Sequence, residues 1–499
     1  MLSLSIFSND LSDSIYISVI YTSAVIRMAE KTKSKGKKLE EKLLFKPKSI
    51  GLEKKDFFKE STEFCEGFKE FLKNKTEREV VDYTIPLLKR NGYKEYVSGK
   101  KYPAGSKLFF NNRGKNLIMV TIGKKDISEG VRIGASHIDS PRLDFKPVPL
   151  FEDTEMAFMK THYYGGIKKY QWSTVPLSLH GVVTLKSGKT IKVVIGESAE
   201  DPVFCVTDLL PHLARDQMKK TASEIITGEQ LNVLVGSWPF NDDEASQKVK
   251  LNIANILFER YGITEADFLS AELCAVPAFA PVDVGLDRSM IGAYGQDDSV
   301  CAYCNIMAEI DCKDPEYTTV TVLADKEETG SDGPTGLNSM FLIDFIEDMA
   351  TTYGAELRKV LAKSLCISCD VNSAYDPAFS ENYERTNCSY LNHGPSISKY
   401  GGSGGKYSTN DASAEMMAFI RKILDENGIM WQIGELGRVD NGGGGTVAMY
   451  ISQHNIDTVD FGVPVLSMHS PFEVTAKADV LMLYLAMKTF YEYPKTFKK

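Results

Sequence analysis

"VTVLADKEETGSDG", residues 320–333, is the stretch of this sequence that most directly indicates its fold. The apolar run Val320–Ala324 is typical of a buried strand, and the glycines after it mark a loop. Two adjacent glutamates, Glu327 and Glu328, stand where that strand ends. A solvated turn is the ordinary interpretation of such a pair, so the rest of the sequence must decide between a turn and a functional site.

Strand and helix patterns alternate on both sides of this stretch. Residues 58–91 have helical spacing and end at Asn91-Gly92, a typical helix stop. Further helical patterns are "DDSVCAYCNIMAEI", "LNSMFLIDFIEDMATTYG" and "DASAEMMAFIRKILDENG". Strand patterns are "KLFFNN", "NLIMVTIG", "VRIGASHID", "YTTVTVLAD" and "LAKSLCISCDV". This alternation predicts an α/β fold in which helices cover both faces of a sheet.

A middle segment departs from that alternation. "GVVTLKSGKTIKVVIGE", residues 181–197, has the alternating pattern of a β-hairpin with Ser-Gly at its turn. We therefore predict a β-rich inserted domain over residues 150–284. Residues 28–149 and 285–499 would form the two parts of the α/β domain.

The N-terminal region carries an apolar run and a basic run. The apolar run, Ile15–Ile26, follows acidic residues and precedes Arg27, which reverses the order of a secretory signal. It is also shorter than the ~20 residues of a membrane span. We expect residues 1–27 to be dispensable or the product of an upstream start site, with a weak signal or anchor as the alternative. The basic run, Lys31–Lys46, is expected to be solvated and poorly ordered, with RNA binding or localisation as the alternative.

Composition and cysteine usage limit the class of protein. The chain has 499 residues, a formal net charge of -9 and ordinary hydrophobic content, which argues against a nucleic-acid or membrane partner. Nine cysteines in so long a chain suit a reducing compartment, so we predict a cytoplasmic protein. Two C-x-x-C pairs, Cys301/Cys304 and Cys366/Cys369, allow a thiolate zinc site, but their apolar surroundings favour buried packing residues.

Acidic and imidazole side chains gather at the predicted strand ends and helix starts. They are His137 with Asp139, Asp297 with Asp298, Glu327 with Glu328, Asp370, and His469. Side chains at one edge of an α/β sheet lie close together, and so many carboxylates would repel one another without cations. Two divalent metal ions would resolve that repulsion, and imidazole with carboxylate suits zinc, manganese or cobalt. One unligated glutamate would then serve as a general base.

At this point the sequence resembles the metalloaminopeptidase family that contains aspartyl aminopeptidase and vacuolar aminopeptidase I. The resembling stretches run in family order and cover nearly everything after about residue 50. They are "SHIDSPRLDFKP", "GQDDSVCAY", "DKEETGSDGPTG", "SCDVNSAYDP", "GPSISKYGGSGGKYSTNDASAE", "GRVDNGGGGTVA" and "VPVLSMHSPFEV".

The resemblance implies a role for each residue of the constellation. His137, Asp297 and Asp370 would hold one metal ion, and Asp297 would bridge to a second. Glu328 and His469 would complete the second site. Glu327 would be the general base, and Asp139 would orient His137. The paired glutamates would then be adjacent because one is a base and the other a ligand.

The resemblance also implies an assembly and a substrate class. The inserted segment would be a dimerisation domain, and the dimers would form a tetrahedral dodecamer that admits peptides. Within "FCVTDLLPHLARDQ", His212 would reach a neighbouring active site, with Asp208 as the alternative. Lys399 would bind an acidic substrate side chain, with Lys406 as a competing candidate. The glycines of residues 442–445 would contact substrate.

The sequence therefore predicts a mixed-sheet α/β metallopeptidase with a β-rich insertion. Its expected activity is that of a dinuclear zinc aminopeptidase that removes acidic or bulky apolar N-terminal residues from peptides. The alternatives are a metal-dependent carboxypeptidase or amide deacylase, and a non-catalytic assembly protein.

Overall fold

The computed structural model describes residues 33–496, which form two units, residues 33–47 and residues 48–496. The expectation for residues 1–27 lies outside the described part of the chain. Across residues 33–496, no helix combines the length and apolar character that crossing a membrane requires.

The smaller unit contains one helix, α2 (Lys35–Leu43). Ser34 caps it by accepting a hydrogen bond from the backbone N–H of Lys37, and Lys33 pairs with Glu41 at 2.8 Å. None of the helix residues is buried. The described part of the basic run, residues 33–46, is therefore solvated, as predicted. Most of it is helical rather than poorly ordered, because the helix carries a cap and ion pairs.

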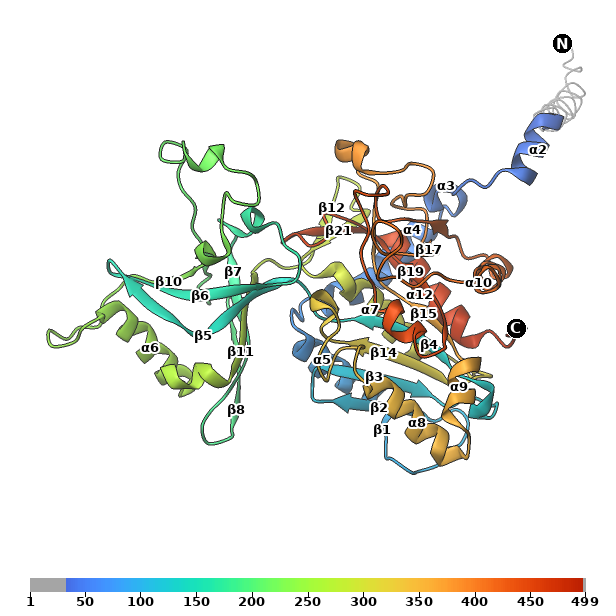
Figure 1. The fold of residues 1–499 in the computed structure, drawn as a ribbon, viewed down its shortest axis with the longest axis horizontal. Helices are drawn as coiled ribbons and strands as arrows, with labels where there is room; N and C mark the ends of the chain where they lie inside the picture. The colour runs from blue at the N-terminus through green and yellow to red at the C-terminus, as the bar shows by residue number, and fades with distance from the viewer. Residues whose placement is uncertain (1–32, 497–499) are drawn as a thin grey trace, which may run out of the picture. The chain divides into compact units, whose positions relative to one another are not determined.

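A nine-stranded mixed sheet forms the α/β part of the larger unit (Figure 1). Its strands, in order across the sheet, are β1 (Lys94–Glu95), β2 (Lys107–Asn112), β3 (Asn116–Thr121), β14 (Thr319–Ala324), β4 (Arg132–His137), β15 (Leu365–Ser368), β19 (Asp457–Gly462), β17 (Ser396–Ser398) and β18 (Gln432–Ile433). The four neighbours β14, β4, β15 and β19 are parallel, so their carboxyl ends lie at one edge. All five predicted strand patterns form strands of this sheet.

Helices cover both faces of this sheet, as predicted. Alternate side chains of β3 point to opposite faces: Leu117 and Met119 join one hydrophobic core, whereas Ile118 and Val120 join another. The first core is covered by α3 (Ile50–Glu53), α4 (Phe57–Phe71), α5 (Glu77–Arg90), α7 (Gln296–Asp311), α10 (Ala414–Glu426) and α12 (Lys477–Glu492). The second is covered by α8 (Phe341–Tyr353), α9 (Leu357–Lys363) and α11 (Ala448–Ser452).

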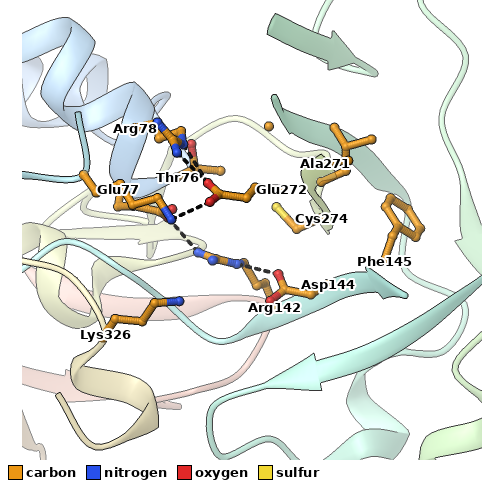
Figure 2. A pocket seen from close by; sticks show the side chains of 13 residues that line it. Thr76, Glu77, Arg78, Arg142, Asp144, Phe145, Ala271, Glu272, Cys274 and Lys326 are labelled. Atoms are coloured by element: carbon orange, nitrogen blue, oxygen red, sulfur yellow. Dashed lines mark hydrogen bonds and ion pairs between the residues drawn. The ribbon is translucent and has the colours of Figure 1, made fainter. Parts of the chain in front are cut away.

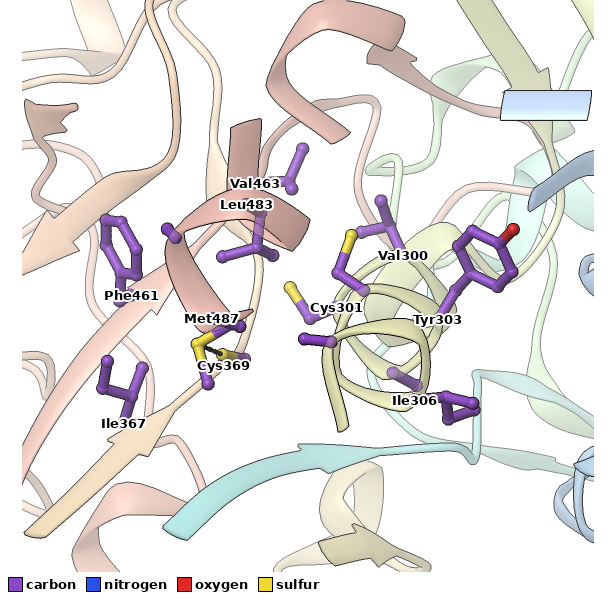
Figure 3. Close-up of a cluster of buried hydrophobic side chains, with 14 of the residues drawn as sticks. Val300, Cys301, Tyr303, Ile306, Ile367, Cys369, Phe461, Val463, Leu483 and Met487 are labelled. Atoms are coloured by element: carbon purple, nitrogen blue, oxygen red, sulfur yellow. Dashed lines mark hydrogen bonds between the residues drawn. The ribbon is translucent and has the colours of Figure 1, made fainter. Parts of the chain in front are cut away.

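The cysteines of the two C-x-x-C pairs are buried packing residues. Figure 3 shows Cys301 and Cys369 among apolar side chains of the first core. The Sγ atom of Cys369 lies 3.3 Å from the Sδ atom of Met487. Among residues 33–496, the groups of side chains that could hold a metal ion contain no cysteine. Packing therefore accounts for these residues.

A second sheet is antiparallel throughout and seven-stranded. Its order is β8 (Thr190–Ile195), β7 (Leu177–Thr184), β11 (Ala271–Pro277), β5 (Arg142–Asp153), β6 (Met156–Tyr164), β10 (Val233–Gly236) and β9 (Cys205–Val206). The predicted hairpin is β7 and β8, and helix α6 (Lys248–Tyr261) contacts β5, β6 and β10. The first strand of this sheet along the chain, β5, begins at Arg142, whereas the predicted insertion begins at residue 150. A strand boundary does not define a domain boundary, so the domain limits stay predictions.

The larger unit also contains a third sheet, which has five strands. Its order is β12 (Val282–Val284), β13 (Met290–Ala293), β21 (Glu473–Ala476), β20 (Pro464–Leu466) and β16 (Asn372–Ser373). The chain passes from β13 into α7, and a short loop joins β20 to β21. These two connections carry two of the predicted site motifs.

Candidate metal centre

The predicted motifs meet at the carboxyl edge of the parallel strands. His137 ends β4, Asp370 follows β15, and the paired glutamates lie in a short 3-10 helix (Glu327–Thr329) after β14. Asp297 enters at the start of α7, and His469 enters from the loop between β20 and β21.

One group of potential ligands consists of His137, Asp297 and Asp370. One donor atom of each lies within 4.8 Å of the others. The Nε2 atom of His137 is 3.1 Å from Oδ1 of Asp297 and 3.9 Å from Oδ1 of Asp370. All three therefore converge on a volume small enough for one cation.

A second group consists of Asp297, Glu328 and His469. The Nε2 atom of His469 is 3.1 Å from Oδ2 of Asp297 and 3.5 Å from Oε1 of Glu328. Asp297 thus presents one oxygen to each group. The Oε1 atom of Glu328 is buried and has no hydrogen-bond partner among the described residues. A buried oxygen without a partner is costly, and a cation would satisfy it.

The electrostatics of the centre favour cations. Burial raises the pKa of Asp370 and of Glu328 well above their usual values, and it raises the pKa of Glu327 to about 7. Burial also acts to raise the pKa of Asp297, but its hydrogen bonds to the two histidines outweigh burial and lower it. So many buried acids can be ionised together only near positive charge. Imidazole nitrogen with carboxylate oxygen is a donor set that fits zinc.

Asp139 contacts both glutamates and His137. Its Oδ1 accepts the backbone N–H of Glu327 at 3.1 Å, and its Oδ2 accepts that of Glu328 at 3.2 Å. The Nδ1 atom of His137 lies 3.0 Å from the backbone oxygen of Asp139 and 3.4 Å from its Oδ1. Donation from Nδ1 leaves Nε2 of His137 free to face Asp297.

The sequence analysis did not predict two residues of the candidate centre, Glu473 and Tyr164. Glu473 is buried, and its carboxylate accepts the backbone N–H groups of Asp297 at 3.0 Å and His469 at 2.7 Å. Tyr164 donates its hydroxyl to Oδ2 of Asp139 at 2.7 Å. Glu473 lies in the same motif as His469, so an acid was visible there. The sequence around Tyr164 carries no comparable signal.

A cavity of about 460 Å³ opens beside both groups of ligands. Its lining includes residues 400–401 and 443–445 of two glycine-rich turns. These turns contact each other where the N–H of Gly402 donates to the carbonyl of Gly444 at 2.6 Å. Leu436, Met449 and Tyr450 supply bulky apolar surface. The described residues that line this cavity include no lysine or arginine.

The three remaining predicted residues lie outside this cavity. Lys399 pairs with Asp411, and Lys406 pairs with the same carboxylate at 2.9 Å. Both lysine side chains are exposed, and neither lines the cavity. His212 is exposed in the inserted segment and does not line it either. Their substrate-binding roles stay predictions.

Comparison with known proteins identifies the family. Residues 71–491 match the family described as "Aminopeptidase I zinc metalloprotease (M18)". The chain belongs to this family. It is 47% identical over 422 residues to the "Probable M18 family aminopeptidase 1" of Clostridium acetobutylicum, covering 83% of this chain and 91% of that protein. The resemblance found in the sequence is thereby confirmed.

Solved structures of M18 aminopeptidases share the fold. The crystal structure of an M18 aminopeptidase from Thermotoga maritima matches with a TM-score of 0.86 and 41% identity, covering 90% of this chain and all of that one. A more distant match is the mApe1 dodecamer of S. cerevisiae, with a TM-score of 0.70, 22% identity and coverage of 86% and 96%.

The family settles the class of reaction. The chain is an aminopeptidase of the zinc metalloprotease type, a hydrolase that acts on peptides. The comparisons support this prediction and give no support to the carboxypeptidase, deacylase or non-catalytic alternatives.

Proposed function

We propose that this M18 aminopeptidase works with two zinc ions and removes single residues from free peptide N-termini. The observation that carries the proposal is the position of Asp297, whose two oxygens face two separate groups of ligands. His137 and Asp370 would complete one site, and Glu328 and His469 the other. Manganese or cobalt would suit the same donors.

When bound, two zinc ions activate water, polarise the scissile carbonyl and stabilise the negative charge that develops on it. Glu327 belongs to neither group of ligands, lines the cavity, and has its backbone fixed by Asp139. These observations support a role for Glu327 in accepting the proton of the attacking water and passing that proton to the leaving amine. Asp139 keeps His137 in the required orientation.

Of the two predicted substrate classes, we propose bulky apolar N-terminal residues. The cavity offers Met449, Tyr450 and Leu436, and its described lining provides no cation for an acidic side chain. It also contains the buried Asp460, whose Oδ1 accepts a hydrogen bond from Thr446 at 2.8 Å. An acidic side chain would lose its hydration beside a like charge, which is costly. Acid binding through Lys399 is the alternative.

Hydrolysis of Asp-, Glu-, Leu- and Lys-nitroanilides tests mechanism and preference together. We expect Leu to be released fastest, with activity abolished by a chelator and restored by zinc. Faster release from Asp or Glu would contradict the proposed pocket and favour Lys399. No release from any substrate by zinc-loaded protein would contradict the proposed function.

Substitution of Glu327 tests the general base. Glu327→Gln should lower kcat by about 100-fold or more because the amide cannot accept the proton, and it should leave the zinc content unchanged. Asp332→Asn, an exposed change in the same loop, is the matched control and should retain activity. Wild-type turnover by Glu327→Gln would show that another residue is the base.

We also propose that the chain forms dimers through its inserted segment, and that these build a tetrahedral dodecamer. Support comes from the dodecameric state of the structurally similar yeast protein and from exposed apolar side chains in the segment. These side chains are Val203, Leu209, Leu210, Leu213, Met218 and Trp238. Sedimentation velocity distinguishes a dodecamer from a monomer.

The nine cysteines are all free thiols, which supports a reducing compartment such as the cytoplasm.

A further inference from the structure

The segment Tyr164–Gly166, at the end of β6 in the seven-stranded sheet, touches three different residues of the candidate metal centre. We propose that this segment positions Asp139, Glu328 and His469, so that the inserted sheet takes a direct part in holding the metal ions. The inference rests on the proposed dinuclear site. It assigns to the insertion a role beyond assembly.

Tyr164 makes the first of these contacts. Its hydroxyl donates to Oδ2 of Asp139 at 2.7 Å, the same oxygen that accepts the backbone N–H of Glu328. Asp139 therefore joins the inserted sheet to the turn that carries the base and a ligand. A hydrogen bond to a carboxylate is about twice as strong as one between neutral groups, so this contact restrains the carboxylate firmly.

Two cations hold the ring of Tyr164 in place. The guanidinium of Arg142 lies 4.3 Å from the ring centroid, and the ammonium group of Lys326 lies 5.2 Å from it. Figure 2 shows Arg142 between Glu77 and Asp144, each 2.8 Å from a guanidinium nitrogen. Arg142 is itself buried and fixed by these acids, so the phenol is oriented by a rigid neighbour.

Gly165 makes the second contact. Its backbone has φ of +74°, a left-handed conformation that favours glycine. A Cβ atom at this position would lie 3.2 Å from Oε2 and 3.3 Å from Cβ of Glu328. The side chain of Glu328 therefore packs directly against the Gly165 backbone, and only glycine allows this approach without a shift.

Gly166 makes the third contact. Its carbonyl oxygen lies 2.8 Å from Nδ1 of His469. Donation from Nδ1 to this carbonyl makes Nε2, which faces Asp297 and Glu328, the ring nitrogen available to a metal ion. A Cβ atom on Gly166 would lie 3.5 Å from Nδ1 of His469, an ordinary contact, and its φ is not left-handed. Gly165 and Gly166 are thus adjacent positions with opposite tolerance for alanine.

The first test removes only the hydroxyl of Tyr164. Metal-free Tyr164→Phe should bind zinc about 10–100-fold more weakly than the wild type in competition with a chromophoric chelator. At saturating zinc its kcat should fall by a similar factor while KM for Leu-nitroanilide stays unchanged. Tyr163→Phe, an exposed change on the same strand, is the control. Wild-type zinc affinity and kcat in Tyr164→Phe would overturn the proposal.

The second test uses the two glycines and does not depend on the first. Gly165→Ala should weaken zinc binding, whereas Gly166→Ala should bind zinc as the wild type does because its carbonyl remains in place. Melting temperatures of the metal-free variants show whether each is folded. Equal zinc affinity in both glycine variants would overturn the proposal. If the wild type itself binds fewer than two zinc ions or hydrolyses no peptide, the proposed function fails instead.

Discussion

At the scale of the residue, Asp297 belongs to both groups of candidate ligands, and Glu473 contacts the backbone of Asp297 and of His469. One buried carboxylate accepts a backbone N–H from each of these two ligands, although they come from different segments of the chain. Burial raises the pKa of Glu473 to about 8 in the metal-free protein. We infer that these two hydrogen bonds help to fix the distance between Asp297 and His469.

Glu473→Gln should weaken zinc binding by about 10–100-fold. Glutamine keeps one acceptor oxygen but places an amide N–H₂ group against the other backbone N–H, which is left unpaired. That loss should also lower the free energy of unfolding by about 1–3 kcal/mol. Chelator competition and thermal unfolding measure the two effects, with the exposed Glu259→Gln on α6 as control. Zinc affinity equal to that of the control would contradict the role given to Glu473.

The sequence analysis singled out His137, Glu328 and Asp370 as candidate ligands, and these roles stay predictions, but it did not find Glu473 or Tyr164. His137, Glu328 and Asp370 stand at or just after strand ends, and the edge of a parallel sheet brings such positions together. Glu473 hydrogen-bonds to particular backbone N–H groups, and Tyr164 hydrogen-bonds to a carboxylate oxygen. A single sequence does not reveal such hydrogen bonds, because they depend on how separate sheets pack against each other.

At the scale of the element, His180 on β7 joins the inserted sheet to helix α5. Its Nδ1 lies 3.0 Å from Glu79 on α5, and its Nε2 lies 3.0 Å from Glu197, which follows β8. Lys75 contacts Glu197 at 2.7 Å, and Lys192 lies 3.8 Å from Glu79. Burial alone would lower the pKa of His180, but the hydrogen bonds and charges of Glu197 and Glu79 outweigh burial and raise it.

This raised pKa predicts a pH-dependent contribution to stability. Because the pKa of His180 is higher in the folded state than its usual value of 6.5, protonated His180 stabilises the fold fully below that value. The stabilisation is lost as pH rises through the folded pKa. The difference in Tm between wild type and His180→Gln should therefore be largest near about pH 6 and shrink at higher pH. His162→Gln, an exposed change on β6, should show no such trend. A pH-independent difference for His180→Gln would contradict the prediction.

Element types could be predicted more securely than element limits. The helical pattern of residues 58–91 divides into α4 and α5 because Thr76 caps a new helix by accepting the N–H of Glu79. Strand β5 begins at Arg142, shortly after β4 ends at His137, and it belongs to the seven-stranded sheet. No change of composition marks that passage, so the sequence gives no signal for the residue at which the seven-stranded sheet begins.

At the scale of the whole molecule, the buried centre makes the stability of the metal-free protein depend on pH. Burial raises the pKa of Glu327 to about 7 and that of Glu473 to about 8. Burial alone would lower the pKa of His469, but Asp297 and Glu328 outweigh it and raise the pKa to about 10. Each of these groups holds its proton to higher pH in the folded state than in the unfolded chain.

Removal of zinc should therefore produce a protein that becomes less stable as pH rises. Stability falls with pH wherever the folded state binds more protons than the unfolded state, here from the usual carboxyl pKa of 4.5 upward. Bound zinc keeps its ligands deprotonated and compensates their charge, and it binds more tightly as fewer protons compete. The Tm of metal-free protein should fall between about pH 5 and pH 8, and its difference from the Tm of zinc-loaded protein should widen over that interval. The stabilising contribution of His180 is lost with rising pH in the metal-free and the zinc-loaded protein alike. The quantity to compare at each pH is therefore the difference in Tm between these two forms. Parallel curves for the two forms would show that the buried acids and histidines are not coupled to metal binding.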